Sequence, residues 1–324
     1  MNGLGVDLEL ERELVVDART ELVPGIVALT LRDPAGGELP QWQPGSHIDL
    51  VLGDDLVRQF SLCGDPADRS AFRVAVLRED DGRGGSVAVH ETLRPGTTVR
   101  SRGPRNHFAF EIAPRYRFIA GGIGITPILP MVRAAAAAGA EWSLAYAGKS
   151  AGGMAFAEEL AAEFPERVRV FESATTGRMD VTAELADPDG VTDIYCCGPE
   201  ALMGAVELAA AEAGWPAGAL HLERFVPREL GEPVWKESFL VDLLLSGHTV
   251  TVDPGQSVLD AVRGTGALVL SSCEEGTCGT CETPLLEGAV EHRDSLLTPE
   301  EQAAGDRMMI CVSRAACPRI VLEL

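Results

Sequence analysis

The chain has 324 residues, of which 46% are hydrophobic and 23% charged, and its formal net charge is −22. This composition is typical of a globular protein with room for two or three domains, and it argues against intrinsic disorder. The negative charge argues against nucleic-acid binding through a basic surface. No apolar run is long enough for a membrane-spanning helix, and the N-terminus lacks the features of a signal peptide. We therefore expect a cytoplasmic protein, in which cysteines stay reduced.

Residues 1–112 are predicted to be all-β. Short runs rich in β-branched and aromatic residues alternate there with clusters of turn-forming residues. These runs cover residues 14–16, 26–31, 47–52, 60–62 and 72–77. Their spacing predicts a closed barrel or a sandwich. One helix is expected over residues 87–93, with Ser86 as its N-cap.

From about residue 113 the pattern changes to alternating strands and helices, which is typical of a doubly wound parallel sheet. The predicted strands are 117–120, 142–146, 168–172 and 193–197, and the predicted helices are 127–139, 154–164 and 200–213. We expect Thr126 to cap the first helix and Pro127 to occupy its first position, where proline is favoured.

Two strand-to-helix turns carry the features of a nucleotide site. Glycines let a phosphate approach the backbone, and a helix N-terminus offers N–H donors and a favourable dipole. The residues concerned are Gly121, Gly122, Gly124, Thr126 and Pro127 in the first turn, and Cys197, Gly198 and Pro199 in the second. A glycine-rich structural turn is the alternative explanation for the first. Together the turns predict a nucleotide across the carboxyl ends of the strands.

The form of the nucleotide stays open at this point. The turn after the second strand of this region, residues 147–150, lacks the acidic residue that binds the ribose of NADH in the dinucleotide fingerprint. Lys149 in that turn would instead tolerate the 2′-phosphate of NADPH.

The first region also contains the elements of a phosphate site. Arg58, Ser61 and the turn Gly84–Ser86 supply a cation, two hydroxyls and a helix N-terminus. Such groups bind phosphate and hydrogen-bond to a polar heterocycle. A lone arginine and a capping serine are, however, structural in most proteins.

A C-terminal set of cysteines is the strongest signal in the chain. It follows a proline- and glycine-containing segment, 226–236, and a predicted hairpin (239–245 and 249–252) and helix (256–263). Cys273, Cys278 and Cys281 are spaced C-x4-C-x2-C, and Cys311 follows downstream, which matches a plant-type [2Fe–2S] site. Zinc is the alternative, but zinc sites commonly use two C-x2-C pairs and only one is present. Because the cluster carries one electron at a time, the chain needs a donor and an acceptor.

The C-terminal region is acidic. It has no lysine after Lys236, and Glu274 and Glu275 lie inside the cysteine loop. An ordinary solvated face explains this as well as a docking surface for a basic partner does.

Taken together, and over essentially the whole chain, these segments resemble the phthalate dioxygenase reductase family, which includes the vanillate O-demethylase reductases. The resemblance implies an antiparallel β-barrel flavin domain over 1–112 and a doubly wound α/β NAD(P)-binding domain over 113–228. A linker over 229–236 and a β-grasp, plant-type ferredoxin domain over 237–324 would follow.

The resemblance also implies roles for single residues in the flavin domain. Arg58-Gln-Phe60-Ser61 is similar to the family's Arg-x-Tyr-Ser flavin motif, with Phe60 in the place of tyrosine, which removes one hydroxyl near the flavin. By this resemblance Arg58 binds the FMN phosphate together with Gly85 and Ser86. Ser61 would then lie near the reactive nitrogen of the flavin.

Further roles follow from the same resemblance for the nucleotide region. Cys197 to Pro199 would form the turn beside the nicotinamide. The segment 221–225 is similar to the family's closing segment, so Glu223 would stand near the nicotinamide and Phe225 would cover the flavin ring. The residues implied to act in catalysis are thus Ser61, Cys197, Glu223 and Phe225.

The activity implied is electron transfer from NADH to FMN, then to [2Fe–2S], then to a terminal oxygenase. A flavin fits between the other two because it accepts two electrons as hydride and releases them singly. The acceptor would be a Rieske-type oxygenase or O-demethylase, with a cytochrome P450 as the alternative. A monomer is expected, and a nucleotide-binding redox sensor without turnover is the non-enzymatic alternative.

Overall fold

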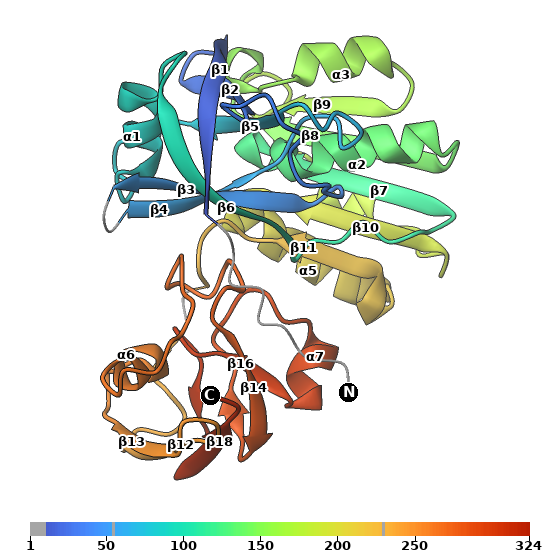
Figure 1. Ribbon diagram of the computed structural model, residues 1–324. Helices are drawn as coiled ribbons and strands as arrows, with labels where there is room; N and C mark the ends of the chain where they lie inside the picture. Colours follow the sequence, from blue (N-terminus) through green and yellow to red (C-terminus); the bar gives the residue numbers. More distant parts are fainter. Residues whose placement is uncertain (1–10, 54–55, 229–230) are drawn as a thin grey trace. The chain divides into compact units, whose positions relative to one another are not determined.

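The structure, a computed structural model, describes residues 11–53, 56–228 and 231–324 (Figure 1). The chain divides into two compact units, Met1–Glu223 and Arg224–Leu324. The predicted boundary at residue 113 lies inside the first unit and stays a prediction, as does the linker 229–236, of which residues 229 and 230 lie outside the described ranges.

The first six strands form one antiparallel sheet in the order β4-β3-β6-β1-β2-β5. They are β1 (Arg12–Val23), β2 (Ile26–Arg32), β3 (Ser46–Gly53), β4 (Leu56–Ser61), β5 (Phe72–Leu77) and β6 (Thr98–Asn106). Just after β4, Leu62 bridges Val74, and the N–H of Cys63 donates to the carbonyl of Arg73 at 2.8 Å. These bonds join the two ends of the sheet, so the predicted β-barrel is confirmed.

Strand β6 was not predicted. Only Val99 and Ser101 of its side chains are buried, and the strand also carries Pro104. Its place between β3 and β1 is set by pairing with both neighbours, such as Leu50 opposite Ser101. Strand β6 therefore forms through pairing with its neighbours, although its own apolar pattern is weak.

Helix α1 (Gly85–Thr92) begins earlier than predicted, and the prediction of Ser86 as its N-cap is wrong. Gly84 takes the cap position with a φ of +79°, a conformation that glycine adopts without strain. The Ser86 hydroxyl lies in the first turn, where it accepts from the N–H of Glu79 at 3.0 Å. Ser86 thus ties α1 to the preceding turn.

The second sheet of the first unit is parallel, with the order β11-β10-β7-β8-β9. Its strands are β7 (Arg115–Gly121), β8 (Glu141–Gly148), β9 (Val168–Glu172), β10 (Thr192–Cys197) and β11 (Leu220–Glu223). Its helices are η1 (Gly122–Gly124), α2 (Ile125–Ala137), η2 (Ala151–Gly153), α3 (Ala157–Glu163), α4 (Val181–Glu184), α5 (Glu200–Ala213) and η3 (Ala217–Ala219).

Helices cover both faces of this sheet. Phe118 of β7 packs in one apolar cluster with Leu129 of α2, whereas its neighbour Ile119 packs in another with Val206 of α5. Because successive strand residues point to opposite faces, α2 and α5 lie on opposite sides. The predicted doubly wound fold is confirmed.

Helix α2 also begins earlier than predicted. Its cap is Gly124, because the 3₁₀ turn η1 runs directly into the helix. Thr126 is therefore inside α2, where its hydroxyl donates to the carbonyl of Ile123 at 2.9 Å. The predictions of Thr126 as cap and Pro127 as first residue are wrong, although both lie in the first turn.

The second unit contains a mixed five-stranded sheet in the order β13-β12-β18-β14-β16 and a small sheet of β15 and β17. Its elements are β12 (Phe239–Leu243), β13 (His248–Val252), α6 (Val258–Arg263), β14 (Glu282–Glu287), β15 (Val290–Glu291), α7 (Pro299–Ala304), β16 (Arg307–Met309), β17 (Arg314–Ala315) and β18 (Arg319–Leu322). Strands β12 and β18 are parallel, and α6 contributes Val258 and Val262 to the core beside Val241 and Ile320. This is the predicted β-grasp ferredoxin arrangement.

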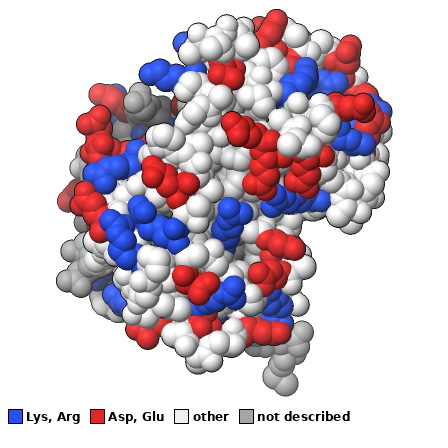
Figure 2. All heavy atoms as spheres, turned by 90° about the horizontal axis from the view of Figure 1, so that it is seen from above, with Lys and Arg blue, Asp and Glu red and all other residues white. Residues whose placement is uncertain are grey.

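Two surface observations complete the fold. Within the described ranges, no helix has the length and apolar character needed to cross a membrane. On the face drawn in Figure 2, acidic and basic side chains lie intermingled, so the excess negative charge is not gathered there into one patch.

Candidate functional site

The order of the parallel strands in the first unit switches between β7 and β10, and folds of this kind have a crevice at the strand ends there. The chain passes from β7 to β8 and β9 on one side, and returns to β10 and β11 on the other. Open α/β sheets bind ligands at such a switch point, outside the carboxyl ends of the strands. In register, Cys197 pairs with Ala120 on one neighbour and with Glu223 on the other. The strands β7, β10 and β11 therefore bring the two predicted turns and Glu223 to one edge.

The two turns contact each other backbone to backbone. A Cβ on Gly124 would lie 2.3 Å from the carbonyl oxygen of Cys197, and one on Gly121 would lie 2.7 Å from Cδ of Pro199. A Cβ on Gly198 would lie 3.0 Å from Cα of Gly121, which is also a tight contact. The glycines thus let the two turns pack closely against each other. At Gly122, by contrast, a Cβ would meet nothing within 4 Å, so this position leaves space of the kind a phosphate needs.

Tyr146 of β8, to which no role was assigned from the sequence, supports the glycine turn. Its hydroxyl lies 3.0 Å from the carbonyl oxygens of both Gly122 and Ala155. The backbone of Gly122 has a φ of +53°, a conformation that glycine adopts without strain. A tyrosine in an otherwise apolar strand was the available signal, because a buried hydroxyl needs a partner.

Three of the four residues implied to act in catalysis meet at this edge. Ser61, from the barrel strand β4, hydrogen-bonds to the carboxyl group of Glu223. The Glu223 side chain as a whole is half-buried, but its Oε2 is inaccessible to solvent and has no hydrogen-bond partner among the described residues. Burial raises the pKa of Glu223 to about 8, against the opposing effect of the Ser61 hydrogen bond. The carboxyl group therefore keeps its proton at neutral pH.

Cys197 stays neutral beside it. The thiol is fully buried, and burial, together with the negative charge that Glu223 can carry, raises the pKa of Cys197 well above its ordinary value. A protonated carboxyl and a protonated thiol thus stand at the ends of adjacent strands.

The fourth residue, Phe225, is placed differently. It belongs to the second unit and is 42% exposed. Its role over the flavin ring stays a prediction.

The barrel residues predicted to hold phosphate lie together at the start of α1. The Arg58 guanidinium donates to the carbonyls of Val57 and Arg83, each at 2.8 Å. A Cβ on Gly85 would lie 2.3 Å from Cγ of Arg58. The absence of a side chain at Gly85 therefore lets the Arg58 side chain pass over the N-terminus of α1. Phe60, in the place of the family's tyrosine, is half-buried and packs against the barrel core.

These residues fit a flavin and a nicotinamide nucleotide on two observations. Gly85 provides a cradle beside Arg58 that a side chain would fill. The buried Oε2 of Glu223 has hydrogen-bonding capacity that the described part of the chain does not use. Both lie on elements that the barrel and the sheet hold in place.

The four predicted cluster cysteines come together in the second unit, and all are buried. Backbone N–H groups point at their sulfurs. The N–H groups of Glu275 and Thr277 lie 3.3 Å and 3.5 Å from Sγ of Cys273, and the N–H of Cys273 lies 3.4 Å from Sγ of Cys278. Such donors stabilise sulfur that carries negative charge and so tune a bound cluster.

The thiols also contact one another. Hydrogen bonds from Cys278 and Cys311 lower the pKa of Cys273, and contacts with Cys273 and Cys281 raise the pKa of Cys311. Four such thiols cannot ionise together without positive charge between them, so metal binding would release their protons.

Four thiolates are the donor set that a [2Fe–2S] cluster takes. In the described residues no group of three or more His, Cys, Asp or Glu side chains is arranged around one metal-ion position. A [2Fe–2S] cluster instead uses two thiolates for each of two irons. The thiols of Cys63, Cys196, Cys197 and Cys317 are not in disulfides.

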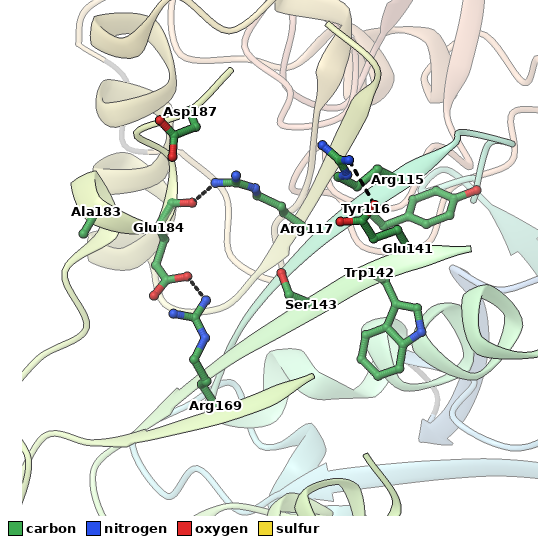
Figure 3. Close-up of a pocket in the computed structure, with 10 residues that line it drawn as sticks. All are labelled: Arg115, Tyr116, Arg117, Glu141, Trp142, Ser143, Arg169, Ala183, Glu184 and Asp187. Atoms are coloured by element: carbon green, nitrogen blue, oxygen red, sulfur yellow. Dashed lines mark hydrogen bonds and ion pairs between the residues drawn. The ribbon is translucent and has the colours of Figure 1, made fainter. Parts of the chain in front are cut away.

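A separate cavity of about 310 Å³ lies at the opposite edge of the parallel sheet (Figure 3). It is lined by the amino ends of β7 and β8 and by nearby residues: Arg115, Tyr116, Arg117, Glu141, Trp142, Ser143, Arg169, Ala183, Glu184 and Asp187. Its arginines are already engaged. Arg117 donates to the carbonyl of Glu184, and Arg169 pairs with the carboxylate of the same residue. The cavity is thus remote from the strand-end crevice and adds nothing to it.

Comparison with known proteins agrees with the two sites. Residues 242–316 match the 2Fe-2S iron-sulfur cluster binding domain family, and residues 97–220 match the N-terminal domain of the dimethylamine monooxygenase subunit DmmA-like family. The first match contains all four cluster cysteines, and the second spans the glycine turn and the Cys197 turn.

Relatives cover nearly the whole chain. The phenoxybenzoate dioxygenase subunit beta of Ectopseudomonas oleovorans is 40% identical over 301 residues, which are 92% of this chain and 93% of that protein. A solved intact type IV self-sufficient cytochrome P450 monooxygenase is 45% identical with a TM-score of 0.91, over 97% of this chain but only 41% of that longer chain.

A third match aligns from end to end. The solved phthalate dioxygenase reductase, described as a modular structure for electron transfer from pyridine nucleotides to [2Fe-2S], is 33% identical with a TM-score of 0.70. The alignment covers 98% of both chains. Because relatives this similar span the barrel, the parallel sheet and the cysteine domain in one chain, the protein belongs to the phthalate dioxygenase reductase family of flavin- and iron–sulfur-dependent oxidoreductases.

Proposed function

We propose that this protein oxidises NADH at the strand-end crevice and delivers the electrons singly, through a [2Fe–2S] cluster, to a Rieske-type oxygenase or O-demethylase. One observation carries the proposal. Ser61 of the barrel hydrogen-bonds to Glu223 of the parallel sheet, so the residues expected at the flavin and at the nicotinamide meet at one point. A sensor that only bound a nucleotide would have no need of this convergence.

Each cofactor has residues assigned to it. Arg58, Gly85 and Ser86 would hold the FMN phosphate at the start of α1. The turn Gly121–Pro127 would hold the pyrophosphate of NADH, and Cys197, Gly198 and Pro199 would flank its nicotinamide. A bound flavin accepts two electrons as hydride and releases them one at a time. The cysteines Cys273, Cys278, Cys281 and Cys311 would hold the cluster.

Glu223 and Ser61 are the residues that would hold and move a proton at the crevice. Glu223 holds one at neutral pH because burial raises its pKa to about 8. No negative charge then stands beside the place where the nicotinamide would lie. The Ser61 hydroxyl can pass a proton to or from Glu223 through their hydrogen bond.

A residue missed in the sequence supports NADH over NADPH. With the nicotinamide beside β10 and β11, the adenosine half would extend over the ends of β8 and β9. Glu172 ends β9, and its Oε2 accepts from the N–H of Ala151 at 3.0 Å, in the loop that carries Lys149. This carboxylate would accept a hydrogen bond from a ribose 2′-hydroxyl and repel a 2′-phosphate. The loop thus gains, from the next strand, the acidic group absent from its own sequence.

The decisive experiment replaces Cys278 by serine. NADH oxidation with ferricyanide, which can accept electrons without the cluster, should stay nearly unchanged, whereas reduction of cytochrome c should fall by about a hundredfold or more. Cys317→Ser is the matched control, since Cys317 lies in the same unit outside the cluster set. Equal loss of both activities in Cys278→Ser would show that the cluster site is structural. Negligible NADH turnover in the wild type would favour the redox sensor.

A cytochrome P450 is the second candidate acceptor, because a similar reductase forms part of a solved self-sufficient P450. Parallel assays with a Rieske-type oxygenase and with a P450 would separate the two by rate. We further propose that the reductase acts as a monomer, which sedimentation of the loaded protein tests.

A further inference from the structure

A buried carboxylate lies behind the cysteine loop of the second unit. Asp294 is only 2% exposed. Its Oδ2 accepts from the N–H groups of Leu296 at 3.2 Å and Leu297 at 2.8 Å, and its Oδ1 accepts from the hydroxyl of Ser313 at 3.2 Å. These donors satisfy both carboxyl oxygens away from solvent. The electron-transfer route proposed above gives Asp294 no part.

Asp294 lies between the two segments that supply cluster ligands. Gly276 is in the middle of the cysteine loop with a φ of +69°, and a Cβ there would lie 3.0 Å from Cα of Asp294. The N–H of Ser295 donates to the carbonyl of Gly276 at 2.9 Å. On the other side, Ser313 is two residues beyond Cys311. The chain at Asp294 is therefore in direct contact with the loop that would surround the cluster.

No arginine or lysine of the described residues neutralises this charge. Among the described residues, Asp294 has one ion-pair contact, with Nδ1 of His292 at 3.7 Å. The adjacent Arg293 is paired with Glu291 at 2.6 Å. By contrast, Glu274 on the cysteine loop is exposed and paired with Arg263 at 2.6 Å. Its charge is thus screened by solvent and by a cation, whereas that of Asp294 is not.

We propose that Asp294 lowers the reduction potential of the iron–sulfur cluster through its buried negative charge. Reduction adds an electron, and a nearby anion in a weakly polar interior disfavours that addition. The reduced cluster then becomes a stronger donor to the oxygenase. Asp294 is a positioning and tuning residue, since it acts through Gly276 and Ser313 and not by ligating iron. The inference rests on the proposed passage of electrons through the cluster.

The test is an equilibrium redox titration of the full-length, cluster-loaded protein, followed by electron paramagnetic resonance of the reduced cluster. Asp294→Asn keeps the size of the side chain and removes its charge. At a fixed potential the ratio of reduced to oxidised cluster should rise about tenfold, which corresponds to about 59 mV for one electron. Iron content measured beside it verifies that the cluster is present.

Asp253→Asn is the control, because Asp253 is an exposed carboxylate of the same unit. Its potential should equal that of the wild type. An unchanged potential in Asp294→Asn, or an equal shift in the control, would overturn the proposal.

A second variant decides the matter if Asp294→Asn does not retain iron. Ser313→Ala removes one donor and leaves the carboxylate less neutralised, so the potential should fall below that of the wild type. A potential that rises or does not move in Ser313→Ala would then contradict the proposal. Because the titration needs no NADH turnover, its failure is distinct from a failure of the proposed electron route.

Discussion

Two buried carboxylates, Glu223 in the first unit and Asp294 in the second, are held in opposite ways. Glu223 has one hydrogen bond, from Ser61, and a buried oxygen without a partner in the described residues, so burial dominates and raises its pKa to about 8. Asp294 accepts three hydrogen bonds, two from backbone N–H groups and one from the Ser313 hydroxyl. Two carboxyl groups removed from solvent can therefore differ widely in how well their oxygens are satisfied. In this chain the sparsely bonded group suits proton handling, and the fully bonded one suits the tuning of a potential.

The largest effect is expected from removing the proton site. Glu223→Gln keeps the shape of the side chain but cannot exchange a proton, so NADH oxidation with ferricyanide should fall by about a hundredfold, the lower range for a lost acid or base. Stopped-flow reduction of the loaded protein by NADH measures this directly. A rate within twofold of the wild type would mean that the buried carboxyl only fills space.

The pH dependence of stability tests whether Glu223 holds a proton in the folded chain. The pKa of Glu223 is about 8 in the folded chain and near 4.5 as the reference value, so between these pH values the unfolded chain binds fewer protons. Stability should therefore fall as pH rises through that window and level off above it. Urea unfolding at about pH 5 and about pH 8.5 should show this fall in the wild type and a smaller one in Glu223→Gln. The same slope in both proteins would place the titrating group elsewhere.

The smallest effect is expected at Ser61. Its hydrogen bond lowers the pKa of Glu223 and so opposes the effect of burial. In Ser61→Ala the pH at which NADH oxidation changes should move upward, with a loss of rate of only about tenfold at neutral pH. A pH profile that moves downward would show that Ser61 does not act on the carboxyl group.

Local patterns in the sequence were enough to predict much of this molecule. The cluster cysteines follow a fixed spacing, and the two nucleotide turns follow a strand–turn–helix pattern, so both could be read without knowing the fold. Helix starts were less certain, because Ser86 and Thr126 are good capping residues that the structure places inside the first turn.

Residues defined only by distant contacts could not be predicted from local pattern. Glu223 was identified by family resemblance, since nothing around it in the sequence indicates a link to Ser61, 162 residues away by their numbering. Asp294 and Glu172 were missed altogether. Their significance depends on Gly276 and on Ala151, which the folded chain brings to them.

The glycine contacts between the two nucleotide turns have a consequence for protein engineering. A methyl group on Gly124 would collide with the backbone of Cys197, and one on Gly121 or Gly198 would crowd the opposite turn, so the packing of the two turns depends on these glycines. Libraries that randomise these positions should yield mostly inactive clones. Lys149 is exposed and Glu172 half-buried at the far end of the crevice, so they can be varied without disturbing that packing. Coenzyme preference is therefore the property of this reductase most open to redesign.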